Sequence, residues 1–425
     1  MLPYTNLDKN PPSRATTWVR HLCVVSVLCA FAVGLTIGVF IPLVYLRTNT
    51  SSVKEEPNST VIRGIFLNNS YSRFPSVSFP RQQLQQQQQP QQPQEPSALA
   101  HLIQQDVFWG GTVEAALPEG YRSKKHTLWS SYLQTAEAVK METGCGRMQN
   151  RLVTFRDGVK GCVRYRQNTD QIQGELFSFY LARVLNLPNL APSAISVVDL
   201  KSKLWQKLRN EIAAAQWNSN RPIVLTQYIS DLNPANIPGV FRPVDRHLNK
   251  LDVLNMTRNP LVDDSALIKE LVELAQWSDL IVFDYLTANL DRIVNNLYNF
   301  QWNANIMEAP AHNLARKTDS DLLIFLDNES GLLHGYRLLK KYEVYHSILL
   351  ENLCVFRRST AETIAELRTR GNVGDLLKTM FESENDETIK DVLPTIPDKS
   401  VKILNERIER VHDQISKCQS VYGNT

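Results

Sequence analysis

An uncharged apolar run near the N-terminus constrains most strongly what this 425-residue chain can form. Residues 22–46 (LCVVSVLCAFAVGLTIGVFIPLVYL) contain no charged side chain. As a helix with a rise of about 1.5 Å per residue, this run is roughly 37 Å long, enough to cross a hydrocarbon core of about 30 Å with some tilt. A cleaved signal peptide usually has a shorter apolar stretch that ends in small residues, whereas Pro42 and Tyr45 stand near this end. The sequence therefore predicts an uncleaved transmembrane anchor.

The charges around this run predict its orientation. Lys9, Arg14 and Arg20 precede it, and Arg47 is the nearest cation that follows. By the positive-inside rule, residues 1–21 form a cytoplasmic tail and the rest of the chain lies in the lumen or outside the cell, as in a type II membrane protein. The segment that ends at Arg47 also holds the whole formal net charge of +3. The remaining sequence is electrically balanced, which argues against a nucleic-acid-binding protein.

Composition divides the part beyond the membrane into a stalk and a folded domain. Residues 47–105 are rich in Ser, Asn, Pro and Gln, and Gln82–Gln94 is nearly pure Gln and Pro. Such a segment buries too little apolar surface to offset the entropy lost on ordering, so we expect a disordered stalk. Residues 106–425 are then expected to form a luminal domain, and a chain that is 43% hydrophobic can supply its core.

An oxidising compartment favours disulfides among the four cysteines beyond the membrane. Four cysteines allow three pairings. We favour Cys145 with Cys162 and Cys354 with Cys418, because each pair would close a local loop; the other pairings stay open. The sequence also contains candidate glycosylation sites, at Asn58, Asn68 and Asn255.

Residue patterns predict a small β-rich part followed by a large helical part. Asp157-Gly158 is a typical hairpin turn between two β-rich runs. This order indicates an α+β, two-lobed domain, with an N-lobe at 106–228 and a C-lobe at 229–425. The predicted strands are 151–155, 159–166, 194–199, 222–228 and 322–326, and the predicted helices are 128–139, 169–186, 265–288, 339–352, 360–370 and 401–418. A loop is expected from 302 to 319.

Three clusters of polar residues point to phosphoryl transfer. Asp291 follows an apolar helix, with Asn296 five residues on, and Asp327 stands at the tip of an apolar strand. Upstream, Arg164 lies on a strand and Glu175 on the next helix. A phosphoryl-transfer enzyme needs a carboxylate to accept a proton, oxygen ligands for a metal ion, and a strand cation paired with a helix glutamate. These residues occur in the chain order that kinases use.

Each feature also has a simpler explanation. The Asp-x-x-x-x-Asn spacing occurs by chance, an aspartate near a helix end is often a cap, and most Arg–Glu pairs are surface ion pairs. The strand that ends in Asp327-Asn328-Glu329 is the more specific signal, because packing rarely requires a carboxylate there. Asp284 is expected to order the loop around Asp291. The eight histidines have no zinc-ligand spacing, which argues against a zinc site.

Five short motifs together resemble the four-jointed family, which belongs with the Golgi secretory-pathway kinases related to the Fam20 group. The resemblance spans roughly residues 106–418. It implies an atypical, two-lobed protein-kinase-like fold and a Golgi type II Ser/Thr protein kinase that phosphorylates cadherin domains of the Fat and Dachsous type, in planar cell polarity and growth control. The motifs are GCGRMQNRL (144–152), CVRYR (162–166), QIQGE (171–175), ANLDR (288–292) and LDNE (326–329).

The resemblance also implies roles for single residues, with ATP and Mg²⁺ or Mn²⁺ as cofactors. Asp291 would be the catalytic carboxylate, and the metal ligands would be Asp327, Asn296 and Glu329. The residues expected around the nucleotide are Arg164 or Lys160 on the strand, Glu175 on the helix, and Gly144 and Gly146 in the phosphate-covering loop. A glycan on the sequon at Asn328 would block this site, so we expect Asn328 to be unmodified.

Two alternatives remain open. A luminal pseudokinase would bind cadherin-type partners without turnover; retention of Asp291 and Asp327 favours activity. A Golgi glycosyltransferase would share the anchor and stalk, but its Asp-x-Asp triplet usually follows an apolar strand, whereas Asp319-Ser320-Asp321 precedes one. The expected location is the Golgi membrane, with release to the extracellular space left open.

Overall fold

The computed structural model describes residues 101–243, 247–259 and 263–423. The predicted anchor, most of the predicted stalk, and the sequons at Asn58 and Asn68 lie outside these ranges. Within them, every helix is too short or too polar to cross a bilayer. The folded domain includes residues before 106, because β1 (Ile103–Gln104) pairs with β2 (Phe108–Trp109).

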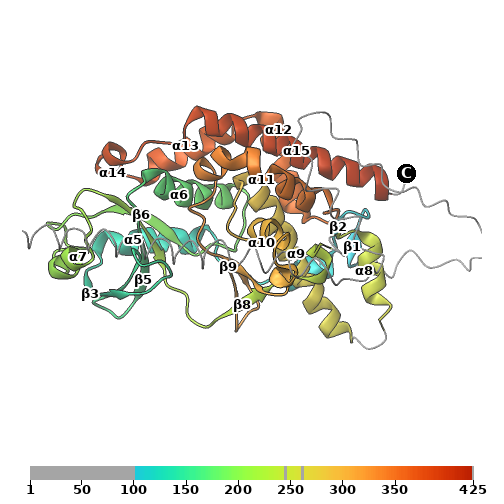
Figure 1. Cartoon of the computed structure of the whole chain (residues 1–425), viewed down its shortest axis with the longest axis horizontal. Coiled ribbons are helices and arrows are strands. Elements are labelled where there is room, and N and C mark those ends of the chain that lie inside the picture. Colours follow the sequence, from blue (N-terminus) through green and yellow to red (C-terminus); the bar gives the residue numbers. More distant parts are fainter. Residues whose placement is uncertain (1–100, 244–246, 260–262, 424–425) are drawn as a thin grey trace, which may run out of the picture. The chain divides into compact units, whose positions relative to one another are not determined.

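The predicted β-rich part is a five-stranded antiparallel sheet in the order β3-β4-β5-β7-β6 (Figure 1). The hairpin at Asp157-Gly158 is confirmed: Gly158 has a φ of 86°, which glycine adopts without steric penalty. The side chain of Asp157 accepts a hydrogen bond from Val159 N at 3.2 Å. The strands are β3 (Ala138–Thr143), β4 (Arg151–Phe155), β5 (Lys160–Tyr165), β6 (Ser193–Val197) and β7 (Pro222–Gln227).

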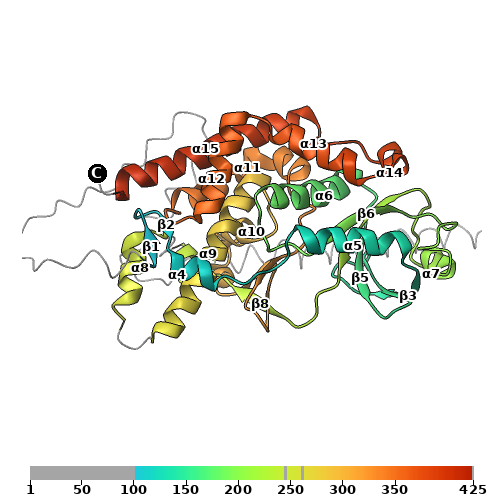
Figure 2. The same cartoon turned by 180° about the vertical axis from the view of Figure 1, so that it is seen from behind.

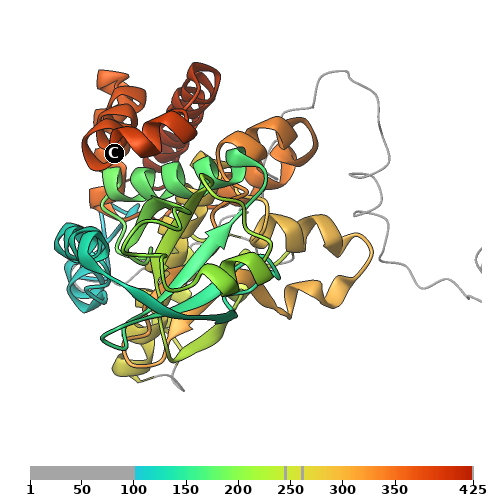
Figure 3. The same ribbon diagram turned by 90° about the vertical axis from the view of Figure 1, so that its left-hand side faces the viewer.

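Helices cover both faces of this sheet. On one face lies α5 (Ser123–Thr135; Figure 2). It packs through Trp129, whose indole donates to Leu225 O at 3.0 Å. On the other, α6 (Thr169–Val184) lies between the sheet and the C-terminal helices (Figure 3). The predicted helix 128–139 was wrong at its end, because from residue 138 the chain pairs with β4 instead.

The predicted loop at 302–319 was also wrong. It contains β9 (Pro310–Lys317), the central strand of a second, three-stranded antiparallel sheet. Its neighbours are β8 (Leu232–Asn236) and β10 (Leu323–Phe325). The sequence of β9 lacks a clean alternation of apolar and polar residues, so pairing on both sides stabilises a strand that local pattern does not reveal.

Apart from this sheet, the C-terminal part is helical, as predicted. Its long central helix, α9 (Asp264–Thr287), begins at an N-cap: the side chain of Asp263 accepts from Ala266 N at 2.8 Å. Most of the apolar side chains of α9 are buried in the larger of two core clusters. The remaining helices are α4 (Gly111–Ala116), α7 (Arg209–Ala214), α8 (Lys250–Thr257), α10 (Ile293–Phe300), α11 (Leu333–Glu351), α12 (Arg358–Arg370), α13 (Val373–Glu384), α14 (Glu387–Val392) and α15 (Asp398–Tyr422), with short 3₁₀ helices at Gly239–Phe241 and Ala304–Met307.

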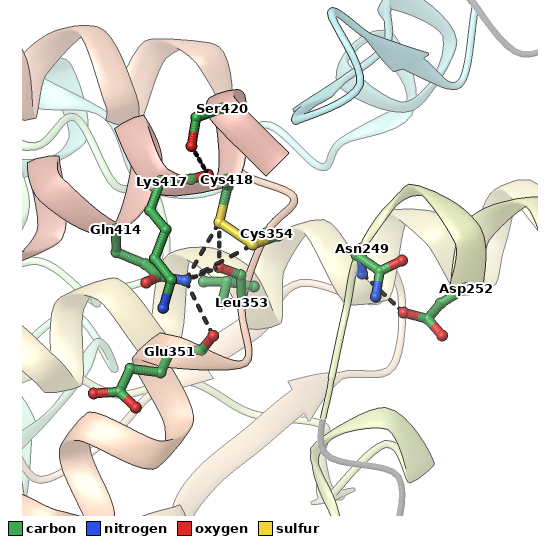
Figure 4. Close-up of a disulfide and its surroundings, with 9 residues drawn as sticks. All are labelled: Asn249, Asp252, Glu351, Leu353, Cys354, Gln414, Lys417, Cys418 and Ser420. Carbon is green, nitrogen blue, oxygen red and sulfur yellow. Dashed lines mark hydrogen bonds between the residues drawn. A yellow bond between two sulfur atoms is a disulfide. The ribbon is translucent and has the colours of Figure 1, made fainter. Parts of the chain in front are cut away.

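Both favoured disulfides are present, Cys145–Cys162 and Cys354–Cys418. Figure 4 shows the second, which joins α15 to the segment after α11. Beside it, the amide of Gln414 donates to Glu351 O at 3.1 Å and to Leu353 O at 3.2 Å. These contacts satisfy carbonyls at the C-terminal end of α11, which would otherwise lack partners in the helix.

Removing the Cys354–Cys418 bond is expected to destabilise the C-terminal helices. The two residues are 64 apart in sequence, and a cross-link that closes a loop of this size typically stabilises a fold by about 2–4 kcal/mol. We expect Cys354→Ala with Cys418→Ala to lower the free energy of unfolding by that amount. Pulse proteolysis in increasing urea measures this change. An unfolding midpoint equal to that of the wild-type chain would contradict the prediction.

Candidate active site

The candidate active site lies where β5 and α6 meet the segments that follow α9 and β10. Arg164 lies in β5 and Glu175 in α6. Asp327 stands two residues beyond the end of β10, and Asp291 lies in the short segment between α9 and α10. Arg164 forms ion pairs with Glu175 and Asp327, although Arg164 and Asp327 are 163 residues apart in sequence. Arg147, which also contacts Glu329, lies next to Asp291.

Arg164 is at the centre of this group. Its Nη1 lies 2.7 Å from Asp327 Oδ1 and 2.8 Å from Glu329 Oε2, and its Nε lies 3.3 Å from Glu175 Oε2. Burial acts to lower the pKa of Arg164, but the three carboxylates outweigh it and the pKa is raised. Burial raises the pKa of Glu175, and the negative charges of Asp327 and Glu329 act in the same direction, against the lowering effect of Arg164.

Glu329 is almost fully buried, with 1% of its side chain exposed. Its Oε2 lies 2.6 Å from Arg166 Nε as well as 2.8 Å from Arg164 Nη1. Its Oε1 lies 2.8 Å from Arg147 Nη1 and 3.2 Å from Gln171 Nε2. Both oxygens are therefore engaged by nitrogen donors, so Glu329 links β5, α6 and the loop before β4.

The turn that carries Asp327 is held against α6. Glu175 Oε2 accepts a hydrogen bond from Asn328 N at 2.6 Å. At Gly174, an added Cβ would lie 2.6 Å from Glu329 O, so only glycine permits this approach. Asp327 itself has a φ of 53°, a left-handed conformation that aspartate tolerates better than most residues. Backbone contact, rather than side-chain pairing alone, therefore fixes the direction of its carboxylate.

Gly144 and Gly146 lie in the hairpin loop between β3 and β4. Gly146 has a φ of 88°, and Cys145 is tied to Cys162 of β5. The loop also carries Arg147, whose Nη2 lies 3.7 Å from Asp291 Oδ2 in addition to its contact with Glu329. The side chain of this loop residue thus extends over the candidate active site.

Asp291 is held by its neighbours on both sides. Asn289 Oδ1 accepts from Asp291 N and from Ser330 Oγ, each at 3.0 Å. Burial, and then the negative charge of Asp327, raise the pKa of Asp291, while Arg147 and a hydrogen bond from Ser330 act to lower it. Asp291 is one-third exposed, so a substrate hydroxyl can approach this oriented carboxylate.

Arg292 follows Asp291 in the chain, and its side chain is fully buried. It forms an ion pair with Asp284, which confirms that Asp284 orders this segment. Its Nη2 donates to Leu326 O at 2.9 Å and to Asn328 Oδ1 at 2.5 Å, next to Asp327 in sequence. Burial raises the pKa of Asp284 to about 6, against the lowering effect of Arg292.

Two of the predicted site residues do not contact this group. Asn296 lies in α10 and donates to Ile306 O at 2.9 Å. Lys160 stands at the exposed start of β5, where its charge acts on Glu142 of β3. Arg164 therefore provides the strand cation next to the carboxylates.

The oxygen ligands predicted here suit a hard cation such as Mg²⁺ or Mn²⁺. Asn296 Oδ1 is buried and has no hydrogen-bond partner among the described residues, which fits an unused ligand. Yet in the described ranges no group of three or more His, Cys, Asp or Glu is arranged to hold a metal ion. Asp327 and Asn296 each offer a side-chain oxygen of the kind that such a cation binds. Both carboxylate oxygens of Glu329 are already in contact with nitrogen atoms of Arg147, Arg164, Arg166 and Gln171.

The sequons in the described residues differ in exposure. Asn255 is exposed on α8 and is accessible to modification. Asn328 is 2% exposed, and its Nδ2 donates to Phe325 O at 3.1 Å. This burial supports the expectation that Asn328 carries no glycan.

Sequence reasoning assigned no role to several residues that complete the site. Three of them are arginines inside or beside motifs already noted, and the others hold the turn or Asp291. The sequence signal that could have revealed the arginines was their number in the motifs GCGRMQNRL, CVRYR and ANLDR. That number is larger than a single Arg–Glu ion pair requires. The residues are Arg147, Arg166, Arg292, Gln171, Gly174, Asn289 and Ser330.

Two solved structures show a distant similarity to this chain. The Golgi casein kinase with Mn/ADP bound aligns with a TM-score of 0.44 and 13% identity, over 70% of this chain and 77% of that chain. Hydra Fam20 with sugar aligns with a TM-score of 0.46 and 14% identity, over 69% and 89%.

Sequence comparison identifies the family. The Four-jointed box protein middle domain matches residues 124–421. The Drosophila melanogaster protein named "Extracellular serine/threonine protein kinase four-jointed" is 53% identical over 75% of this chain, which spans 62% of that protein's length. Four-jointed box protein 1 of Xiphophorus maculatus is 38% identical over 76% of this chain and 74% of that protein, and that of Homo sapiens 35% identical over 75% and 71%. The chain belongs to the four-jointed box family.

Proposed function

We propose that this chain is a secretory-pathway protein kinase that transfers the γ-phosphate of ATP to Ser or Thr of extracellular cadherin domains. The observation that carries the proposal is the convergence of Asp291, Asp327, Arg164 and Glu175, each on the type of element that a phosphoryl-transfer site requires. The name of the Drosophila relative supports the same activity. The cadherin substrates, the Golgi membrane location and the type II anchor are part of the proposal.

In this proposal each residue has a separate task. Asp291 accepts the proton of the attacking hydroxyl, since it is oriented by Asn289 and is partly exposed. Arg164, always charged, supplies a planar guanidinium that orients phosphate oxygens and, through Glu175, couples α6 to the site. A divalent cation, when bound, would neutralise phosphate charge, with Asp327 and Asn296 as its candidate ligands.

The test is phosphate transfer by the full chain, purified in mild detergent. With γ-labelled ATP, Mn²⁺ and a cadherin-domain acceptor, we expect label on serine or threonine of the acceptor, and loss of transfer when EDTA removes the cation. ATP binding without any transfer, over a range of acceptors, would instead identify a pseudokinase. A chain that neither binds ATP nor transfers label would contradict the proposal altogether.

A further inference from the structure

The side chain of Arg147 occupies a position that structural ion pairing alone does not explain. Its side chain is 52% exposed, whereas those of Arg164 and Arg166 are 14% and 2% exposed. All three guanidiniums contact Glu329. Arg164 and Arg166 contact Oε2 of this carboxylate, and Gln171 donates to its Oε1. Arg147 can therefore leave Glu329 while each carboxylate oxygen keeps a nitrogen partner.

The backbone of the loop that bears Arg147 is held firmly. Cys145 is bonded to Cys162 of β5, and the buried Asn150 donates from Nδ2 to Cys145 O at 2.7 Å. Arg166 Nη1 in turn donates to Asn150 Oδ1 at 2.7 Å. Asn150 N also donates to Arg147 O at 2.9 Å. These contacts hold the backbone that carries Arg147 in place beside the candidate active site.

The guanidinium of Arg147 is exposed enough to contact an anion from solution. It lies between Glu329 and Asp291, at 2.8 Å and 3.7 Å. A guanidinium binds phosphate oxygens through two parallel hydrogen bonds, and a partly exposed one requires little desolvation to do so. A terminal phosphate is thus a chemically suitable partner for Arg147.

We infer that Arg147 is a phosphate-binding residue that contacts the terminal phosphates of the nucleotide, and that the Cys145–Cys162 disulfide positions it. This inference rests on the proposed function. It gives the loop a charged contact with the nucleotide, in addition to the close approach of backbone to phosphate that is expected at Gly144 and Gly146. It also makes the disulfide part of the binding site rather than a brace of the sheet.

The test compares nucleotide binding by variants of the full chain. We expect Arg147→Gln to weaken ATP binding about tenfold, which corresponds to about 1.4 kcal/mol, and to leave adenosine binding unchanged. The ATP affinity of Arg147→Lys should lie between those of the wild type and Arg147→Gln, since lysine keeps the positive charge but lacks the planar guanidinium that forms two parallel hydrogen bonds. Arg156→Gln is the matched control: Arg156 is a 63% exposed arginine of the same sheet, paired with Glu137 and remote from these contacts. It should bind ATP as the wild type does.

The disulfide is tested by a double-mutant cycle. Cys145→Ala with Cys162→Ala should also weaken ATP but not adenosine binding, and adding Arg147→Gln should cause little further loss, because both changes remove the same contact. Fully additive losses would overturn the role of the disulfide. ATP affinity of Arg147→Gln within twofold of wild type, or a change confined to the KM of the acceptor, would overturn the phosphate contact. A wild-type chain that binds no ATP would overturn the proposed function and this inference together.

Discussion

Asp291→Asn is expected to lower the turnover number for phosphate transfer by about 10²–10⁴-fold, the usual contribution of a positioned general base. The amide has the shape of the carboxylate but cannot accept the proton of the attacking hydroxyl. The backbone contact from Asp291 N to Asn289 does not depend on this side chain. The local fold should therefore persist, and ATP affinity should change little.

The measurement is the rate of transfer at saturating ATP, with ATP affinity determined separately. Asp319→Asn is the matched control, because Asp319 is a 62% exposed aspartate paired with Lys317 and belongs to no site contact described above. It should retain full turnover. If Asp291→Asn keeps more than about a tenth of the wild-type rate, another group accepts the proton and the assignment of Asp291 is wrong.

The β-rich part of the fold was predictable because its signals are local. The Asp157-Gly158 turn sets the register of β4 and β5. The side chain of Asn168 caps α6, accepting from Asp170 N at 3.0 Å. By contrast, β9 pairs on one side with β8, at residues 232–236 and far away in sequence, and on the other side with β10, which follows it across a short turn. The sequence of β9 has no clean alternation of apolar and polar residues, so a loop was the wrong prediction.

The residues of the candidate site also divide into those that local sequence signals indicated and those that could be found only from the structure. Asp327 was the more specific signal, because packing rarely requires a carboxylate at the tip of an apolar strand. Asp291 was noted by its place after an apolar helix, with Asn296 five residues on. Arg147 was not, because its contact with Glu329 depends on how the loop closes onto β5 through Cys145 and Asn150. The contact of Arg164 with three carboxylates could also be found only from the structure, since the sequence predicted only its pairing with Glu175.

The site also depends on a buried pair that sequence reasoning identified only in part. Asp284 was expected to order the segment around Asp291, but its partner was not predicted. Arg292 is fully buried and binds Asp284, Asn313 O and the turn before Asp327. A buried charge that loses its partner is strongly destabilising, whereas removal of both charges is much less so.

Arg292→Met is therefore expected to lower the free energy of unfolding by about 3–5 kcal/mol, because it leaves Asp284 buried and uncompensated. Pulse proteolysis of the full chain in urea measures the change. Arg316→Met is the control: Arg316 pairs with Glu273 but is 34% exposed, and a pair of this kind contributes about 1 kcal/mol or less.

The combination of Arg292→Met with Asp284→Asn separates charge from packing. If the uncompensated carboxylate causes the loss, the neutral amide should restore a large part of the stability, although Leu326 O and Asn313 O still lack their donor. If the double variant is as unstable as Arg292→Met, the backbone contacts of Arg292 dominate instead. A loss below about 1 kcal/mol in Arg292→Met would contradict both explanations, because a buried carboxylate cannot lose its only described guanidinium partner at so small an energetic penalty.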